Sequence, residues 1–221
     1  SREMDNTIQA VLTSLNASPT YRDLFWKAFG VKTISAEELG LATEQFMLTI
    51  MSGNSKFDRH LRGIESLTAQ ELEGLRLFNG EANPNAPMRG ADCFHCHGGA
   101  LFTNNKFANN GLDATTTDPG LGSVTGDPND LGKFKTPTLR NIAYTAPYMH
   151  DGRFQTLMQV INFYNNGTQA TSPNIDPSMG DISRPGGLGL NLQDRMALVA
   201  FLNTLSDPSI ETDTLFQNPF N

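Results

Sequence analysis

The segment Cys93-Phe94-His95-Cys96-His97 constrains this chain of 221 residues more than any other part of its sequence. It holds the only two cysteines in the chain. A disulfide between them would close a very small, strained ring, and no other thiol is present to form a bridge elsewhere. The fold therefore gains no stabilising disulfide, and both thiols are available for local chemistry.

A Cys-x-x-Cys-His spacing is typical of c-type haem attachment. Two thiols on one helical turn can add to the two vinyl groups of a haem, and the adjacent His97 can bind the iron. Zinc needs four ligands, whereas His60 and His150 are isolated in the sequence. A thioredoxin-like dithiol needs a βαβ context that is absent, and chance occurrence is the third alternative. We predict one covalent haem, with His95 as a solvent-side spacer.

The overall charge of the chain argues against two classes of partner. The formal net charge is −7, whereas nucleic acids and anionic membranes require a basic patch. No apolar run approaches the ~20 residues of a membrane span. No signal peptide opens the chain. The sequence therefore predicts no nucleic-acid partner and no membrane span.

Helical periodicity and helix-end signals predict an all-α fold. We expect Trp26 to pack within the first helical layer. The first expected helix carries apolar residues from Met4 to Leu15. The second starts at Pro19 and ends at Gly30, and the third starts at the Ser35–Glu38 capping box and ends near Gly53. Three more helices are expected at 68–80, 156–166 and 192–205.

Two further features concern how these helices pack. Gly74 lies inside the helix at 68–80, where it costs about 1 kcal/mol relative to alanine. A close crossing with the helix at 192–205 would explain that cost. The irregular stretch 98–140 is rich in Asn, Gly, Asp and Thr. A loop of this length is uncommon in a compact domain unless it surrounds a ligand, and a haem would be such a ligand.

The iron of such a haem has a sixth coordination position. Methionine there raises the reduction potential and tyrosine lowers it. Spacing alone does not choose among the candidates, which are Met149, His150, Tyr164 and Met179. Most methionines are simply packed in a core.

A family resemblance appears in two further blocks. Residues 132–141 read Gly-Lys-Phe-Lys-Thr-Pro-Thr-Leu-Arg-Asn, and residues 145–152 read Thr-Ala-Pro-Tyr-Met-His-Asp-Gly. Together with the haem motif they resemble the bacterial di-haem cytochrome c peroxidases. That family includes the enzyme that forms tryptophan tryptophylquinone in methylamine dehydrogenase. Similar segments occur in a fixed order along nearly the whole chain.

The resemblance implies a domain organisation. Family members carry two haems in two cytochrome c-like domains, of which the first reacts with peroxide and the second passes electrons to it. Residues 1–62 resemble linker helices that belong to, or pack on, a missing N-terminal domain. Residues 63–221 resemble the second cytochrome c-like haem domain, with long irregular loops. We therefore expect a C-terminal part of a longer protein, without full peroxidase activity alone.

The resemblance also assigns site residues. It makes Cys93 and Cys96 the attachment points and His97 the proximal ligand. Tyr164 matches the sixth-ligand position, where peroxidases of this family have Met and the quinone-forming enzyme has Tyr. Alternatively, Tyr164 is an aromatic side chain packed in the core. Met149 is the rival candidate for the sixth ligand. Arg140 either binds a haem propionate or forms a structural salt bridge. The Lys135 and Pro137 carbonyls are candidates for a calcium site, and His150 lines the pocket or is a core histidine.

The implied function is that of the electron-transfer haem in a periplasmic peroxidase that reduces hydrogen peroxide to water. The electron donor would be a small cytochrome or copper protein, and a homodimer is possible for such an enzyme. One alternative is a mono-haem c-type electron carrier without catalysis. Another is a Tyr-ligated, high-valent haem enzyme that oxidises a protein substrate.

Overall fold

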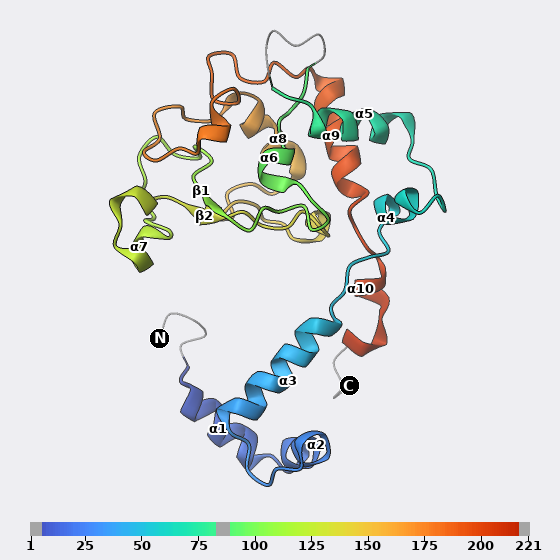
Figure 1. The fold of residues 1–221 in the computed structure, drawn as a ribbon, viewed down its shortest axis with the longest axis vertical. Helices are drawn as coiled ribbons and strands as arrows, with labels where there is room; N and C mark the ends of the chain where they lie inside the picture. The colour runs from blue at the N-terminus through green and yellow to red at the C-terminus, as the bar shows by residue number, and fades with distance from the viewer. Residues whose placement is uncertain (1–5, 83–88, 217–221) are drawn as a thin grey trace. The chain divides into compact units, whose positions relative to one another are not determined.

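The computed structural model describes residues 6–82 and 89–216, which form a mostly helical fold with two short strands (Figure 1). The all-α prediction is confirmed at this level. None of the described helices is both long and apolar enough to cross a membrane. The chain divides into two compact units, residues 1–51 and 52–221. This division lies eleven residues before the boundary expected after residue 62, because Phe57 belongs to the core of the second unit.

The first unit consists of three helices, the second and third of which start at the predicted signals. They are α1 (Ile8–Ala17), α2 (Pro19–Phe29) and α3 (Ala36–Thr49). Gly30 ends α2 in the left-handed conformation, with φ of 71°. The capping box of Ser35 and Glu38 opens α3, which ends at Thr49, before the expected Gly53. The predicted contribution of Met4 lies outside the described residues.

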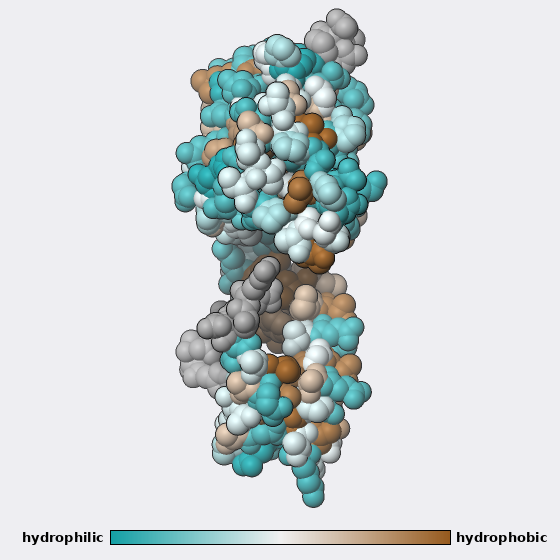
Figure 2. Space-filling model, turned by 90° about the vertical axis from the view of Figure 1, so that its left-hand side faces the viewer, coloured by the Kyte–Doolittle hydropathy of each residue, from teal (hydrophilic) through white to brown (hydrophobic). Residues whose placement is uncertain are grey.

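The core of the first unit is small. Phe25 and Ile34 are its buried hydrophobic residues among those described. Trp26 is 57% exposed, so its predicted burial is wrong. Consecutive residues of a helix point about 100° apart, so the helix that buries Phe25 turns Trp26 outward. Several other large apolar side chains of this unit are exposed, as the brown areas of Figure 2 show.

The second unit contains the remaining elements. Three predicted helices are confirmed: α5 (Ala69–Asn79), α8 (Leu157–Asn166) and α9 (Leu192–Asn203). Each begins with a capping box. The short elements are α4 (Lys56–Leu61), α6 (Phe94–His97), α7 (Gly122–Thr125), α10 (Ser209–Thr212), and the 3₁₀ turns η1 (Pro128–Asp130), η2 (Ile142–Tyr144), η3 (Pro177–Met179) and η4 (Thr214–Phe216).

Helices α5 and α9 cross closely, as the position of Gly74 predicts. A Cβ atom on Gly74 would lie 2.0 Å from the carbonyl oxygen of Ala197 and 2.7 Å from the Cβ of Phe201. No side chain fits between the two backbones at this point. The missing side chain of Gly74 is therefore what permits the crossing.

Four phenylalanines form the centre of the core beside this crossing. Phe201 is fully buried and its ring packs on Phe57, Phe78 and Phe102, with centroids 5.5, 5.2 and 6.3 Å away. These separations are typical of edge-to-face and tilted aromatic pairs. The cluster joins α4, α5, α9 and the loop after α6, and it provides a rigid base beneath the candidate site.

The irregular stretch 98–140 contains the two strands, β1 (Phe107–Ala108) and β2 (Phe134–Lys135). They pair antiparallel, with Phe107 opposite Lys135. Turns and the elements α7 and η1 account for much of the chain between them. The stretch is thus mostly loop, as predicted, and the small pairing fixes its two ends together.

Asp207 is a buried carboxylate that holds two chain segments together. It is fully buried and accepts hydrogen bonds from the backbone amides of Gly53 (3.0 Å) and Asn54 (2.8 Å) through Oδ2. Oδ1 accepts from the amide (3.0 Å) and hydroxyl (2.6 Å) of Ser209. Burial acts to raise the pKa of Asp207, but these donors outweigh it and the net pKa lies below the ordinary value of 3.8.

We expect Asp207→Asn to lower the free energy of unfolding by about 2–3 kcal/mol at pH 7, because charge-assisted hydrogen bonds are lost. A depressed folded-state pKa stabilises the fold above the unfolded pKa and ceases to do so as pH falls through the folded pKa. The difference between wild type and variant should therefore shrink below about pH 4. Urea unfolding at a series of pH values measures it, with Asp23→Asn on the surface as control. A difference that is constant down to pH 2 contradicts the assignment.

Candidate haem site

The second unit contains a large cavity of about 440 Å³ with mostly apolar walls. We call it the central cavity. Helices α8 and α9, the end of α5 and the loop at 133–150 contribute to its walls. Its apolar lining includes Phe78, Ala91, Leu139, Ile142, Leu157, Val160, Ile161, Leu198 and Leu202. A cavity of this size and character suits a planar apolar cofactor.

The predicted attachment residues lie on the wall of this cavity. Cys93, Cys96 and His97 all line it. Cys93 precedes the short helix α6, and its carbonyl accepts the amide of His97 at 2.9 Å, so all three residues share one helical turn. The amide of Asn104 anchors the same turn by donating to the carbonyl of Cys96 at 2.8 Å.

His97 is oriented for metal binding through Nε2. Its Nδ1 lies 3.1 Å from the carbonyl oxygen of Phe102, which can only accept a hydrogen bond, so Nδ1 carries the proton. Burial lowers the pKa of His97, which keeps the imidazole neutral. A neutral ring with a fixed Nδ1–H presents Nε2 as a ligand.

The surroundings of the two cysteines differ from those of a reactive redox dithiol. Burial, with smaller contributions from Asp92 and Cys96, raises the pKa of Cys93 to about 12. Burial also raises the pKa of Cys96. Reactive dithiols have lowered pKa values instead. Within residues 6–82 and 89–216, no further His, Asp or Glu completes a group of three with these thiols.

The two leading candidates for the sixth ligand meet in the same cavity. Tyr164 and Met149 both line it, and the amide nitrogen of Asn110 contacts both: 3.0 Å from the Tyr164 hydroxyl and 3.6 Å from the Met149 sulfur. Burial raises the pKa of Tyr164 to about 12, against the lowering effect of Asn110. A metal cation beside the oxygen acts in the opposite direction, because it favours the phenolate.

The other candidates have different surroundings. Met179 lines the cavity but belongs to the core, and only 4% of its surface is exposed. The His150 ring lines the cavity edge and stacks on Phe134, with centroids 3.8 Å apart and planes inclined by 8°. His150 is therefore not an enclosed core histidine.

Arg140 does not line the central cavity in the described structure. Its guanidinium donates to both carboxylate oxygens of Asp58, at 3.0 and 3.1 Å, and its Nε donates to the carbonyl of Ala100 at 2.8 Å. Arg140 therefore forms a salt bridge, which is one of the two roles that we considered for it. The bidentate pair holds α4 against the loop that follows the haem motif.

The calcium candidates line the cavity as well. Lys135 and Pro137 both contribute to its wall, and the Lys135 ammonium lies 3.1 Å from Asn105 Oδ1. A calcium site at these carbonyls remains a prediction.

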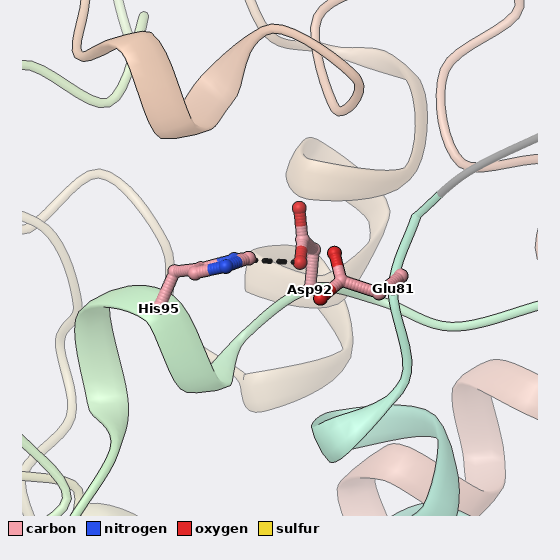
Figure 3. Close-up of side chains that lie close together, drawn as sticks. All are labelled: Glu81, Asp92 and His95. Carbon is pink, nitrogen blue, oxygen red and sulfur yellow. Dashed lines mark ion pairs between the residues drawn. The ribbon is translucent and has the colours of Figure 1, made fainter.

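A small polar cluster lies beside the motif (Figure 3). His95 Nδ1 lies 2.7 Å from Asp92 Oδ1, and Glu81 completes the group. The His95 side chain is 42% exposed, consistent with a solvent-side position. Asp92 is buried at the cavity wall, and burial raises its pKa. Sequence reasoning missed both Asp92 and Asn110. Asp92 directly precedes Cys93, whereas only the folded loop after β1 brings Asn110 to the cavity.

Known proteins are similar to this chain over most of its length. A family model described as di-haem cytochrome c peroxidase matches residues 1–66. Cytochrome-c peroxidase IdrP1 of Pseudomonas sp. (strain SCT) is 31% identical over 230 residues, covering 88% of this chain and 56% of that protein. Methylamine utilization protein MauG of Methylorubrum extorquens is 34% identical over 219 residues, covering 92% and 54%. The chain spans about half the length of these curated relatives.

Solved structures give the same result. A MauG-like protein associated with microbial copper homeostasis superposes with a TM-score of 0.78 and 33% identity, covering 98% of this chain and 67% of that one. By sequence and by structure, the chain belongs to the di-haem cytochrome c peroxidase family.

Proposed function

We propose that the second unit holds one haem c, attached through Cys93 and Cys96, with His97 as a ligand of its iron. This haem relays electrons within a two-haem peroxidase that reduces hydrogen peroxide to water. The observation that supports the proposal is that the attachment cysteines, His97 and Tyr164 all line one large apolar cavity. Family membership supports the peroxidase-like haem function.

The residues around the cavity have distinct tasks in this proposal. The two thiols fix the cofactor covalently, and the hydrogen bond from His97 Nδ1 to the Phe102 carbonyl (3.1 Å) orients the ring. The apolar side chains of α8 and α9 exclude water. When bound, haem supplies one-electron redox chemistry that no side chain provides. Tyr164 lies on α8 and would lower the reduction potential of the haem.

Several finer assignments belong to the same proposal. Residues 52–221 form a cytochrome c-like domain, and the first unit packs on a further domain with the second haem. The protein works in the periplasm, where attachment of haem c takes place, and receives electrons from a small cytochrome or copper protein. Carbonyls at Lys135 and Pro137 contribute to a calcium site, and the enzyme is a homodimer.

The decisive experiment counts haems in the natural full-length gene product. Absorbance after denaturation in pyridine gives the number of covalent haems per chain. Two haems support the peroxidase. One haem identifies a mono-haem electron carrier, and none overturns the haem site.

Tyr164→Phe tests the sixth ligand. We expect the ferric absorption and electron paramagnetic resonance spectra to lose their tyrosinate features, and the midpoint potential to rise, because phenolate stabilises ferric iron. Met149→Leu is the matched control and should keep the wild-type spectrum. An unchanged spectrum in Tyr164→Phe rules out ligation by this residue.

A second function is favoured by one observation. Tyrosine occupies the position that we propose for the sixth ligand, in a chain that is 34% identical to a methylamine utilization protein MauG. A tyrosine-ligated haem that oxidises a protein substrate is therefore the alternative to a peroxidase. Turnover of peroxide with a reduced cytochrome, compared with peroxide-dependent oxidation of a protein partner, separates the two.

A further inference from the structure

Asn110 lies between the two candidate ligands. It follows β1 and lines the central cavity, half-buried. Its side-chain nitrogen is 3.0 Å from the Tyr164 hydroxyl oxygen and 3.6 Å from the Met149 sulfur. A primary amide nitrogen carries two protons, so it can donate to both atoms at once.

The backbone around Asn110 is held from both sides. The buried Asn109 side chain donates to the Ser172 hydroxyl at 3.0 Å and the Pro173 carbonyl at 2.7 Å, and its Oδ1 accepts the amide of Gly111 at 2.9 Å. The Gly111 carbonyl accepts the amide of Gln169 at 2.8 Å. These bonds pin the loop to the segment after α8, so the Asn110 amide is preorganised and does not depend on a mobile loop.

The two acceptors differ in strength. A phenol or phenolate oxygen is a good hydrogen-bond acceptor, whereas a thioether sulfur is a weak one. The amide therefore holds the Tyr164 oxygen, at 3.0 Å, more firmly than the Met149 sulfur, at 3.6 Å.

The Met149 backbone adds a second observation. Its φ is 74°, a left-handed conformation that is unusual for a residue other than glycine. The Tyr148 amide and carbonyl both pair with Phe154, which fixes the turn just before Met149. The Met149 sulfur is thus held near the cavity by the main chain, and its use as a ligand depends on what its side chain contacts there.

We propose that Asn110 is a positioning residue that selects Tyr164 over Met149 as the side chain facing the haem iron. This rests on the proposed haem site and deepens it. The amide would fix the phenol oxygen in the cavity by the shorter of its two contacts and would restrain the thioether by the weaker one. Without the amide, Met149 competes for the sixth position and the potential of the haem rises.

The test uses the haem-loaded chain and two donor-free replacements of different shape. Asn110→Leu removes the amide, and Asn110→Asp keeps its outline but offers no N–H. Asn79→Leu is the control, since its amide donates to the Leu75 carbonyl at the exposed end of α5. Ferric absorption, resonance Raman scattering with ring-deuterated tyrosine, and the midpoint potential are measured for each variant and for Tyr164→Phe and wild type.

We expect both Asn110 variants to lose most of the tyrosinate signal and to rise in midpoint potential, while Asn79→Leu matches wild type. The thioether-to-iron charge-transfer band should appear in Asn110→Leu and vanish in Asn110→Leu combined with Met149→Leu. That pattern supports selection by Asn110.

Two contrary results have different meanings. If Tyr164→Phe changes the spectrum but both Asn110 variants match wild type, Asn110 has no selecting role and tyrosine ligation stands. If Tyr164→Phe itself matches wild type, tyrosine ligation is wrong, and the role proposed for Asn110 falls with it.

Discussion

A chain in which Cys93 and Cys96 are both replaced by alanine is expected to carry no covalent haem and to lose cooperative unfolding of its second unit. The central cavity has a volume of about 440 Å³. Without the cofactor its mostly apolar walls are exposed to water, which costs about 25 cal/mol per Å² of apolar surface. Whole domains have unfolding free energies of only about 5–15 kcal/mol. The unit should therefore collapse to a loosely packed state when the cofactor is absent.

The measurement combines mass spectrometry for attached haem with near-ultraviolet circular dichroism during urea unfolding. Cys93 packs against the hydrophobic core and the Cys96 sulfur lies 3.7 Å from the Ser178 hydroxyl, so the effect of lost packing needs its own control. The single variant Cys93→Ala is the matched control, because it keeps one thioether bond and His97. A haem-free double variant that unfolds in the same sharp transition as wild type would show that haem does not fill the cavity.

Gly74→Ala is expected to destabilise the second unit by about 3 kcal/mol or more, although alanine is the better helix former. The gain in helix propensity is about 1 kcal/mol. Against it stands a Cβ only 2.0 Å from the Ala197 carbonyl oxygen, a contact with backbone that no side-chain rotation relieves. Helix α9 must move away from α5, which also displaces Leu198 and Leu202 at the cavity wall.

Urea unfolding followed by circular dichroism measures this effect. Gly40→Ala is the matched control, since Gly40 lies inside α3 and a Cβ there meets nothing within 4 Å. It should stabilise the first unit by up to about 1 kcal/mol. If Gly74→Ala also leaves the midpoint unchanged or raises it, the two helices are not in backbone contact at this position.

Local signals in the sequence predicted much of the fold. A capping box needs only two side chains three residues apart, so Ser35 with Glu38 and Thr68 with Glu71 marked their helices correctly. Gly74 marked its crossing because an interior glycine is costly unless something requires it. The short α4 was not predicted, since six residues give too little periodicity.

The candidate site divides in the same way. The haem motif is contiguous, so Cys93, Cys96 and His97 were found together. Asn110 contacts a tyrosine 54 residues later in the chain, and no spacing rule connects such residues. Arg140 was recognised as a carboxylate partner, but Asp58, its partner 82 residues away, was not identified. The prediction that Trp26 is packed within the first helical layer was wrong for a third reason. The first unit buries few side chains.

The ion pair between Arg140 and Asp58 has a consequence for the order of folding. Helices with capping boxes form from neighbouring residues and need no long loop closure, whereas this pair closes a loop of 82 residues. Contacts of high sequence separation form slowly, because chain entropy is lost before they are gained. The same arginine holds Ala100, just after the haem motif. We therefore expect the wall around Cys93 and Cys96 to close late, which leaves both thiols accessible on the nascent chain while haem is being attached.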